Sequence, residues 1–309
     1  MFSYKHYVPI LKGKDGEFRA LELLPTMAKR NITPFIDITR QEPDFTTGRP
    51  REKIEVYLAK KAKKIRKAWS LDRELFVDVF DLDLGLRTSS GVHFSTFLFS
   101  CLRTLQVKSV PVIGLDRSED IDYINAIAEI ASTDKFGVCI RLLQDDLESS
   151  KETYNHVSDL VRALGLSRKG TDMLMDFRSL SMTDIDEVAD TATGFLANLP
   201  NTMDWRTITL SASGFPQDLG GISPSSIDAV PRTEFDLRFE LSRRGRKIRR
   251  MPTFSDYGIC HPDILDFDPR YTPSAAIRYT IEREWLVLKA RSVKRYTYSQ
   301  FRVSIGIQN

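Results

Sequence analysis

Residues 51–81 read REKIEVYLAKKAKKIRKAWSLDRELFVDVFD, a helical pattern followed at once by a strand pattern. In the first part, apolar side chains recur every three or four residues among lysines and arginines: Ile54, Leu58, Ala62, Ile65 and Trp69. That spacing places one apolar stripe along an amphipathic helix. In the second part, residues 74–81 are largely apolar on both alternating sets of positions, which is typical of a strand in a parallel sheet. The stretch therefore predicts a helix–strand unit of an α/β fold.

The same unit repeats along most of the chain. Strand patterns occupy residues 6–12, 32–39, 74–81, 109–116, 136–142, 172–178, 206–213 and 253–260. Helical patterns lie at residues 17–29, 51–69, 94–105, 119–130, 149–164, 184–199 and 235–243. Strands that alternate with helices in this way over about 260 residues predict a (β/α)8 barrel of the TIM type. The alternative, a doubly wound open sheet, is disfavoured because Gly13-Lys14-Asp15-Gly16 is no dinucleotide fingerprint.

Beyond the last of these strands the pattern changes to an antiparallel hairpin. Residues 275–279 and 285–290 are strand-like and flank Thr280-Ile281-Glu282-Arg283-Glu284. The sequence thus predicts a barrel over residues 1–268 and a C-terminal β-hairpin appendage, residues 269–309, packed on the barrel.

Composition describes an ordinary folded protein. Of the 309 residues, 41% are hydrophobic and 28% are charged, which excludes a disordered, collagen-like or coiled-coil chain. The net charge of +3 neither requires nor excludes nucleic acid. Three cysteines without a CxxC motif argue against a disulfide framework or zinc knuckle and favour a reducing compartment. Because the sequence shows neither a long apolar span nor a signal peptide, we expect a cytoplasmic protein that does not bind membranes.

Polar side chains lie where most of the predicted strands end. They are Lys12, Asp37, Asp78, Asp81, Asp116, Arg141, Asp176, Arg178, Ser211, Ser213, Asp256 and Tyr257. In a (β/α)8 barrel the loops after the strands carry the chemistry, so polar residues at that end require an explanation. Alternation places Asp37, Arg141 and Asp176 on the same side of their strands as apolar neighbours. Charges in such surroundings are costly unless they are paired or functional.

Two interpretations of this group are open. In one, aspartates and arginines form a ring of salt bridges at the rim of the barrel. In the other, they line a pocket in which Lys12 and Arg141 hold an anion while carboxylates bind a metal or act as a base. Carboxylates without histidine among them suit a hard cation such as Mg2+. Lys12 and Asp256, from the first and last strands, are expected to approach each other where the barrel closes.

Conventional catalytic groups are sparse. His261, after the last predicted barrel strand, is a candidate for acid–base chemistry, with a hydrogen bond that fixes the loop as the alternative. His93, in the loop after the third strand, is a second candidate of the same kind. Ser211 and Ser213 lack a G-x-S-x-G context, which argues against a serine nucleophile.

Two segments are strongly basic. Residues 60–67 place their lysines around the apolar stripe of a predicted helix, so a solvated outer face explains them. Residues 243–250 are mostly arginine and lysine and are interrupted by Gly245, which indicates a loop. Such a loop can contact the phosphates of a nucleic acid, with simple solvation as the alternative. A continuous basic stripe joining the two segments would favour nucleic-acid binding.

Four stretches resemble the beta protein family of phages and bacterial mobile elements: residues 7–17 (YVPILKGKDGE), 32–38 (ITPFIDI), 254–258 (FSDYG) and 277–280 (IRYT). The resemblance covers essentially the whole chain. It implies a barrel domain in phage–host conflict, as antiviral defence or phage takeover, without an established reaction. By position it implies roles for Lys12, Glu17, Asp37, Asp256, Tyr257, Arg278 and Tyr279. Family members continue past the hairpin into a helical segment with a histidine-rich motif, so we expect a shortened member or a piece of a longer chain.

The leading hypothesis is a barrel that binds a phosphorylated or nucleotide-like ligand at its C-terminal face and hydrolyses it with a divalent cation. Its catalytic candidates are Asp37, Asp78, Asp176, Asp256 and His261. Its ligand-binding candidates are Lys12, Glu17, Arg141, Arg178, Ser211, Tyr257, Arg278 and Tyr279. The alternatives are a non-catalytic sensor or adaptor that recognises a phage or host protein through the barrel rim, and a nucleic-acid binder. Carboxylates that converge on one metal favour the enzyme, whereas carboxylates each paired with an arginine favour the adaptor.

Overall fold

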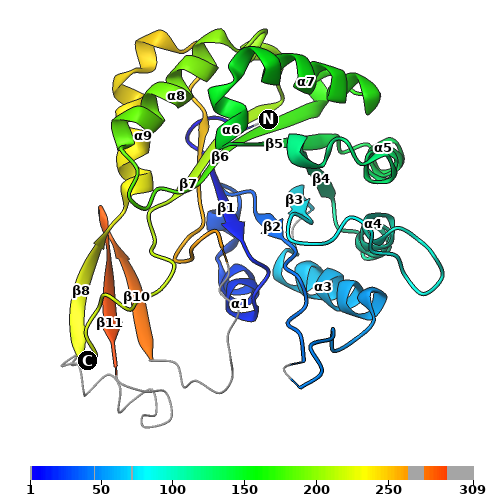
Figure 1. Ribbon diagram of the computed structural model, residues 1–309, viewed down its shortest axis with the longest axis horizontal. Helices are drawn as coiled ribbons and strands as arrows, with labels where there is room; N and C mark the ends of the chain where they lie inside the picture. The colour runs from blue at the N-terminus through cyan, green and yellow to red at the C-terminus, as the bar shows by residue number, and fades with distance from the viewer. Residues whose placement is uncertain (1, 45, 71, 264–274, 291–309) are drawn as a thin grey trace.

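The centre of the molecule is a closed barrel of eight parallel strands, as predicted (Figure 1). The computed structural model describes residues 2–44, 46–70, 72–263 and 275–290. The barrel strands, in their order around the barrel, are β1 (Tyr7–Leu11), β2 (Phe35–Asp37), β3 (Leu75–Asp78), β4 (Ser109–Gly114), β5 (Val138–Leu143), β6 (Thr171–Ser179), β7 (Thr207–Ser213) and β9 (Thr253–Asp256). β1 pairs with β9 and so closes the sheet.

Helices surround the barrel (Figure 1). They are α1 (Asp15–Leu23), α2 (Thr26–Lys29), α3 (Ile54–Ala68), α4 (Phe94–Thr104), α5 (Ile121–Asp134), α6 (Gln144–Glu148), α7 (Ser150–Ala163), α8 (Ile185–Asn198) and α9 (Thr233–Arg243). The helix predicted over residues 17–29 divides into α1 and α2 at Pro25, whose ring cannot continue a helix because it lacks the backbone donor. No helix in the described ranges is both long and apolar enough to cross a membrane.

Two apolar layers hold the barrel together. The larger one fills the space between the strands and the surrounding helices and includes the stripe of α3 that the sequence predicted. The smaller one fills the interior of the barrel. Its members are Val8, Ile10, Phe35, Phe76, Val110, Val112, Cys139, Leu174 and Tyr257. The apolar partners predicted for the charged strand ends therefore point inward, and the charged side chains that share their faces do the same.

A three-stranded antiparallel sheet extends from the C-terminal side of the barrel (Figure 1). The predicted hairpin forms β10 (Ala276–Ile281) and β11 (Glu284–Lys289), and β11 also pairs with β8 (Ser226–Pro231) from the crossover between β7 and α9. One face of this sheet packs through Trp285 and Val287 against Phe215 and Ile222. The sequence did not predict β8. The expected boundary between residues 268 and 269 lies outside the described residues.

Two glycines with positive φ allow a test of how tightly the barrel packs. Gly137 (φ +78°), just before β5, faces the backbone carbonyl of Gly170, whereas Gly165 (φ +66°), after α7, faces open space. Gly165→Ala should lose about 1–2 kcal/mol of unfolding free energy because of its φ alone. Gly137→Ala should lose about 1–3 kcal/mol more, because its added methyl group overpacks the loop. Urea unfolding of both variants measures the difference, and equal losses would contradict it.

Candidate functional site

Arg141 of β5 lies at the centre of a buried polar cluster at the C-terminal end of the barrel, with 1% of its side chain exposed. All five of its N–H donors are used. Nε and Nη2 donate to Asp176 Oδ2 at 2.9 and 2.6 Å. Nη1 donates to Asp37 Oδ1 at 3.1 Å and to Asp78 Oδ2 at 2.8 Å. The other Nη2 bond goes to the Tyr257 hydroxyl at 2.7 Å.

Two further cations complete the pairing of Asp37 and Asp78. Lys12 Nζ donates to Asp37 Oδ2 at 2.7 Å, and Arg117 Nη1 donates to Asp78 Oδ1 at 2.7 Å. Although burial opposes it, the two guanidiniums beside Asp78 hold the pKa of this carboxyl below its ordinary value. We call these seven residues the Arg141 cluster: Lys12, Asp37, Asp78, Arg117, Arg141, Asp176 and Tyr257. Its three carboxylates face three cations, so the cluster is electrically neutral.

Asp176 is equally well satisfied. Its Oδ1 accepts the backbone N–H of Arg178 at 3.0 Å, and its Oδ2 accepts the Tyr257 hydroxyl at 2.6 Å in addition to Arg141. Burial raises the pKa of Tyr257 well above its ordinary value, so the hydroxyl keeps the proton that it donates. Every oxygen of the three aspartates in the cluster thus accepts a hydrogen bond from the protein.

The Arg141 cluster does not fit the Mg2+ ion that the carboxylate pattern suggested. A divalent cation needs carboxylate oxygens that are free to coordinate it. Here those oxygens are occupied by arginine, lysine, tyrosine and backbone donors. Within the described part of the chain, no group of three or more His, Cys, Asp or Glu residues is placed to hold a metal ion. The pairing of each aspartate with an arginine is the arrangement that favours the adaptor.

The expected approach of Lys12 to Asp256 is wrong. Asp256 Oδ1 accepts the Tyr7 hydroxyl at 2.5 Å and the backbone N–H of Gly258 at 2.9 Å. The reason is the direction in which Asp256 points. Phe254, two residues earlier on the same face of β9, packs against Tyr7 and against Phe235 of α9. Asp256 therefore lies on the outer side of the barrel, while Lys12 points inward.

A second buried group of carboxylates forms around Arg232, between β9 and α9. Arg232 Nε donates to Glu234 Oε1 at 3.0 Å, and its Nη2 lies 3.5 Å from Asp256 Oδ2. Glu234 Oε2 accepts the backbone N–H of Gly214 at 3.2 Å. Burial, and then repulsion by Asp256, raises the pKa of Glu234 to about 7. Glu234 can therefore change its protonation near neutral pH.

Three of the predicted or considered site residues hold loops and helix ends. Glu17 accepts the backbone N–H of Lys14 at 2.8 Å and so caps α1. His261 Nδ1 accepts the backbone N–H of Asp263 at 3.0 Å, which is the loop-fixing role given as its alternative. His93 Nδ1 accepts the backbone N–H of Ser95 at 3.2 Å and caps α4. None of these three side chains joins the Arg141 cluster.

The other predicted ligand-binding residues are dispersed. Arg178 lies beside the cluster with a positive φ of 54°, forms an ion pair with Asp263, and places its guanidinium 4.9 Å from the centre of the Phe80 ring. Ser211 is fully buried next to Ser255 of β9, and its hydroxyl has no hydrogen-bond partner in the structure described.

Arg278 and Tyr279 lie on β10 of the added sheet, not on a barrel strand. Arg278 Nη1 donates to the backbone carbonyl of Ile259 at 2.9 Å, and its guanidinium lies 4.7 Å from the centre of the Phe215 ring. Tyr279 is 64% exposed. The family resemblance therefore groups residues that belong to two different places in the molecule.

Sequence reasoning missed four residues that matter in these clusters: Tyr7, Arg117, Arg232 and Glu234. The position of Arg117 in the sequence could have identified it as a site residue. It follows the end of β4 by three residues, in the 3-10 turn Leu115–Arg117. Arg232 and Glu234 lie at the start of α9, where charged residues are ordinary, so their burial could not be read from the sequence.

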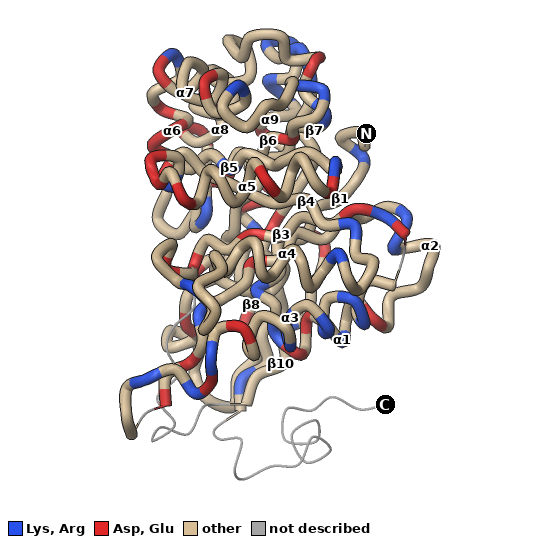
Figure 2. Tube along the Cα trace, turned by 90° about the vertical axis from the view of Figure 1, so that its right-hand side faces the viewer, with Lys and Arg blue, Asp and Glu red and all other residues tan. Residues whose placement is uncertain are grey.

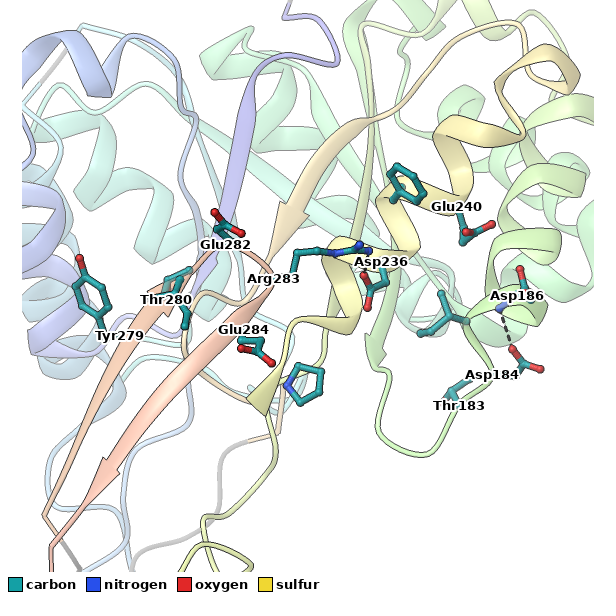
Figure 3. Close-up of a pocket in the computed structure, with 14 residues that line it drawn as sticks. Thr183, Asp184, Asp186, Asp236, Glu240, Tyr279, Thr280, Glu282, Arg283 and Glu284 are labelled. Carbon is teal, nitrogen blue, oxygen red and sulfur yellow. Dashed lines mark hydrogen bonds and ion pairs between the residues drawn. The ribbon is translucent and has the colours of Figure 1, made fainter. Parts of the chain in front are cut away.

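The C-terminal rim also carries a groove between the tip of the β10–β11 hairpin and the first turns of α8 and α9 (Figure 3). Its volume is about 1320 Å3. Its lining residues are 183–186, Pro231, Asp236, Phe239, Glu240 and 279–284. Tyr279, predicted as a ligand-binding residue, lies in this groove.

The two basic segments do not form one stripe. Residues 60–67 lie on α3. Residues 243–250 begin at the last residue of α9, on the opposite side of the barrel in both views (Figures 1 and 2). Arg244 pairs with Asp186, Asp190 and Glu240. Arg250 donates to the carbonyls of residues 202, 205 and 206, which precede β7 at the other end of the barrel from the Arg141 cluster. The arrangement that would favour nucleic acid is absent from the described residues.

A family model, described as "Beta protein", matches residues 7–303, nearly the whole chain. The chain belongs to the beta protein family. No curated protein sequence matches it. Two solved structures with similarity are triosephosphate isomerase from Bartonella henselae (10% identity, 82% of this chain and 91% of that one, TM-score 0.38) and alanine racemase from Clostridium difficile 630 with cycloserine (11% identity, 84% and 52%, TM-score 0.37). Scores this low carry no argument about what the beta protein family member does.

Removing Arg141 should destabilise the barrel strongly. Arg141→Met leaves Asp176 without its guanidinium partner and Asp37 and Asp78 one donor short, which should cost about 3–5 kcal/mol of unfolding free energy. Arg141→Lys keeps the charge but loses the fork geometry, so it should fall between wild type and Arg141→Met. Chemical denaturation measures all three. Wild-type stability in Arg141→Met would show that the cluster does not support the fold.

Glu234 should make stability depend on pH in a defined window. The folded protein keeps the Glu234 proton up to about pH 7, whereas the unfolded chain releases it near the ordinary pKa of 4.5. Unfolding free energy should therefore fall as pH rises through this window, by up to about 3 kcal/mol, at 1.36 kcal/mol per pKa unit. The difference between wild type and Glu234→Gln isolates this contribution, because other groups cancel. A difference that is flat from pH 4.5 to 7 would contradict the assignment.

Proposed function

We propose that this beta protein family member is a non-catalytic recognition protein of phage–host conflict. In this proposal the barrel is a rigid scaffold whose C-terminal rim binds a phage or host protein. The observation that carries it is the Arg141 cluster, in which all five guanidinium donors and every carboxylate oxygen are already engaged within the protein. None of the three carboxylates of this cluster is therefore free to act as a base or to bind a metal for a substrate in the barrel mouth.

The C-terminal rim exposes side chains that can contact a partner. Large apolar side chains are exposed there on three elements: Ile227 on β8, Phe239 on α9 and Tyr279 on β10, each at least half exposed. Exposed apolar patches rimmed by polar residues are typical of protein interaction sites. The role in phage–host conflict rests on membership in a family that occurs in phages and bacterial mobile elements. Together these features favour the adaptor over the hydrolase.

One observation favours a second candidate, the binding of a phosphorylated ligand at the mouth without hydrolysis. Arg117 Nη2 and Arg178 Nη1 are buried and have no hydrogen-bond partner in the structure described. Both guanidiniums pack on the ring of Phe80, at 5.4 and 4.9 Å from its centre. Guanidinium groups with spare donors are suited to phosphate oxygens. Arg178 is thus the predicted ligand-binding residue that this candidate retains.

Recognition through the rim is tested by affinity capture. The immobilised 309-residue protein is incubated with extracts of infected and uninfected bacteria, and bound proteins are quantified by mass spectrometry. A partner should be enriched on wild type and on the control Glu129→Lys, which changes an exposed residue of α5. Its recovery should fall about tenfold on Ile227→Ser or Tyr279→Ser, because truncating an interface anchor costs more than 1 kcal/mol. A rim substitution that leaves capture intact counts against the proposal.

Chemistry at the mouth is tested in parallel. Wild-type protein with ATP, GTP and Mg2+ is followed by 31P NMR, and no product should form. Hydrolysis that is lost in a folded Asp78→Asn variant would overturn the non-catalytic proposal. A phosphorylated ligand that raises the melting temperature of wild type but not of Arg178→Met would establish the second candidate instead.

A further inference from the structure

The rim groove is lined by apolar side chains and by acidic residues, and the acidic ones are labelled in Figure 3. Phe239 of α9 is 52% exposed, and Tyr279 and Ile281 of β10 are 64% and 36% exposed. Tyr279 and Ile281 lie on the same face of the hairpin because they are two residues apart on one strand. Exposed apolar side chains that line a groove beside polar residues are a feature of protein interaction sites. The groove therefore offers a surface on which an apolar side chain of a partner can pack.

The charged residues around this surface are mostly acidic. Among the lining residues are six carboxylates and one arginine: Asp184, Asp186, Asp236, Glu240, Glu282, Glu284 and Arg283. Arg283 pairs with Asp236, and Arg244 pairs with Asp186 and Glu240. Asp184, Glu282 and Glu284 have no cationic partner among the described residues. Three negative charges thus remain at the edge of the groove.

We propose that this groove binds a basic, amphipathic segment of the partner protein. This inference rests on the recognition role proposed above and names the chemistry of the partner. Apolar side chains of the segment contact Phe239, Tyr279 and Ile281. Its lysines or arginines reach Glu282, Glu284 and Asp184. Complementary charge of this kind accelerates association and fixes the orientation of the partner.

Other occupants are less compatible with the groove. Nucleic acids and anionic lipid surfaces carry negative charge and would be repelled by the same three carboxylates. The described residues hold no cluster suited to a metal ion. An acidic peptide would lack any partner except Arg283, which is already paired with Asp236. Of these occupants, a basic amphipathic segment is the one that complements both the apolar and the acidic residues of the groove.

The test measures peptide binding to the 309-residue protein by fluorescence anisotropy. The probe is a labelled 16-residue peptide of lysine and leucine with one apolar face; one comparison peptide replaces lysine by glutamate, and another replaces leucine by serine. Only the lysine–leucine peptide should bind, with an affinity that falls as salt rises. Glu282→Lys with Glu284→Lys should weaken binding at least tenfold, and Phe239→Ser about fivefold. The matched control, Glu119→Lys with Glu129→Lys, changes the net charge equally at exposed positions far from the groove and should stay within twofold.

Equal weakening by both double variants would show that bulk charge, and not the groove, binds the peptide, which would overturn the inference. Unchanged binding in Glu282→Gln with Glu284→Gln, variants that keep the shape of both side chains, would overturn it as well. If the peptide fails to bind while a partner is still captured through Ile227, the groove assignment fails and the recognition role stands. Hydrolysis at the barrel mouth would remove the recognition role whatever the peptides do.

Discussion

The guanidinium of Arg141 is the interaction on which the structure depends most. A charge inside a barrel is tolerable only when hydrogen bonds replace all the water it has lost, because an unpaired buried charge costs several kcal/mol. Arg141 meets this condition with partners from β2, β3, β6 and the residue after β9. The charge of Arg141 is therefore neutralised only when the sheet is closed. The closed sheet in turn fixes the position of each aspartate.

Such a network specifies the fold more than it stabilises it. A buried ion cluster contributes about as much as a well-packed apolar core of the same volume, while the loss of one member is costly. The barrel interior of this protein consists of an apolar layer capped by the neutral Arg141 cluster. Catalytic sites instead keep charged groups free for the substrate and accept the resulting strain. The three aspartates of the Arg141 cluster are fully paired and lack that strain, which moves attention from the interior to the rim.

The sequence was sufficient for the barrel and for much of the cluster. Strand patterns with apolar residues on both faces predicted eight parallel strands. Alternation predicted that Asp37, Arg141 and Asp176 share a face with apolar neighbours, and in the structure those neighbours fill the barrel interior. It could not say which charges pair, because that depends on which face each strand end turns inward. Asp256 illustrates the point: it ends a barrel strand as Asp37 does, yet it points outward to Tyr7 and Arg232. Strand β8 escaped prediction because most of its residues are exposed and its partner β11 follows more than fifty residues later.

Burial also separates the residues that the family resemblance implied into two groups. Lys12, Asp37 and Tyr257 are buried in the Arg141 cluster and expose almost no surface to a partner. Tyr279 is exposed on the added sheet, in which β8 from the barrel crossover pairs with the hairpin. A residue can be characteristic of a family because it holds the scaffold or because it meets the partner, and burial distinguishes the two. In this chain the scaffold residues lie at the strand ends of the barrel, and the residues able to meet a partner lie on the added sheet and the helices beside it.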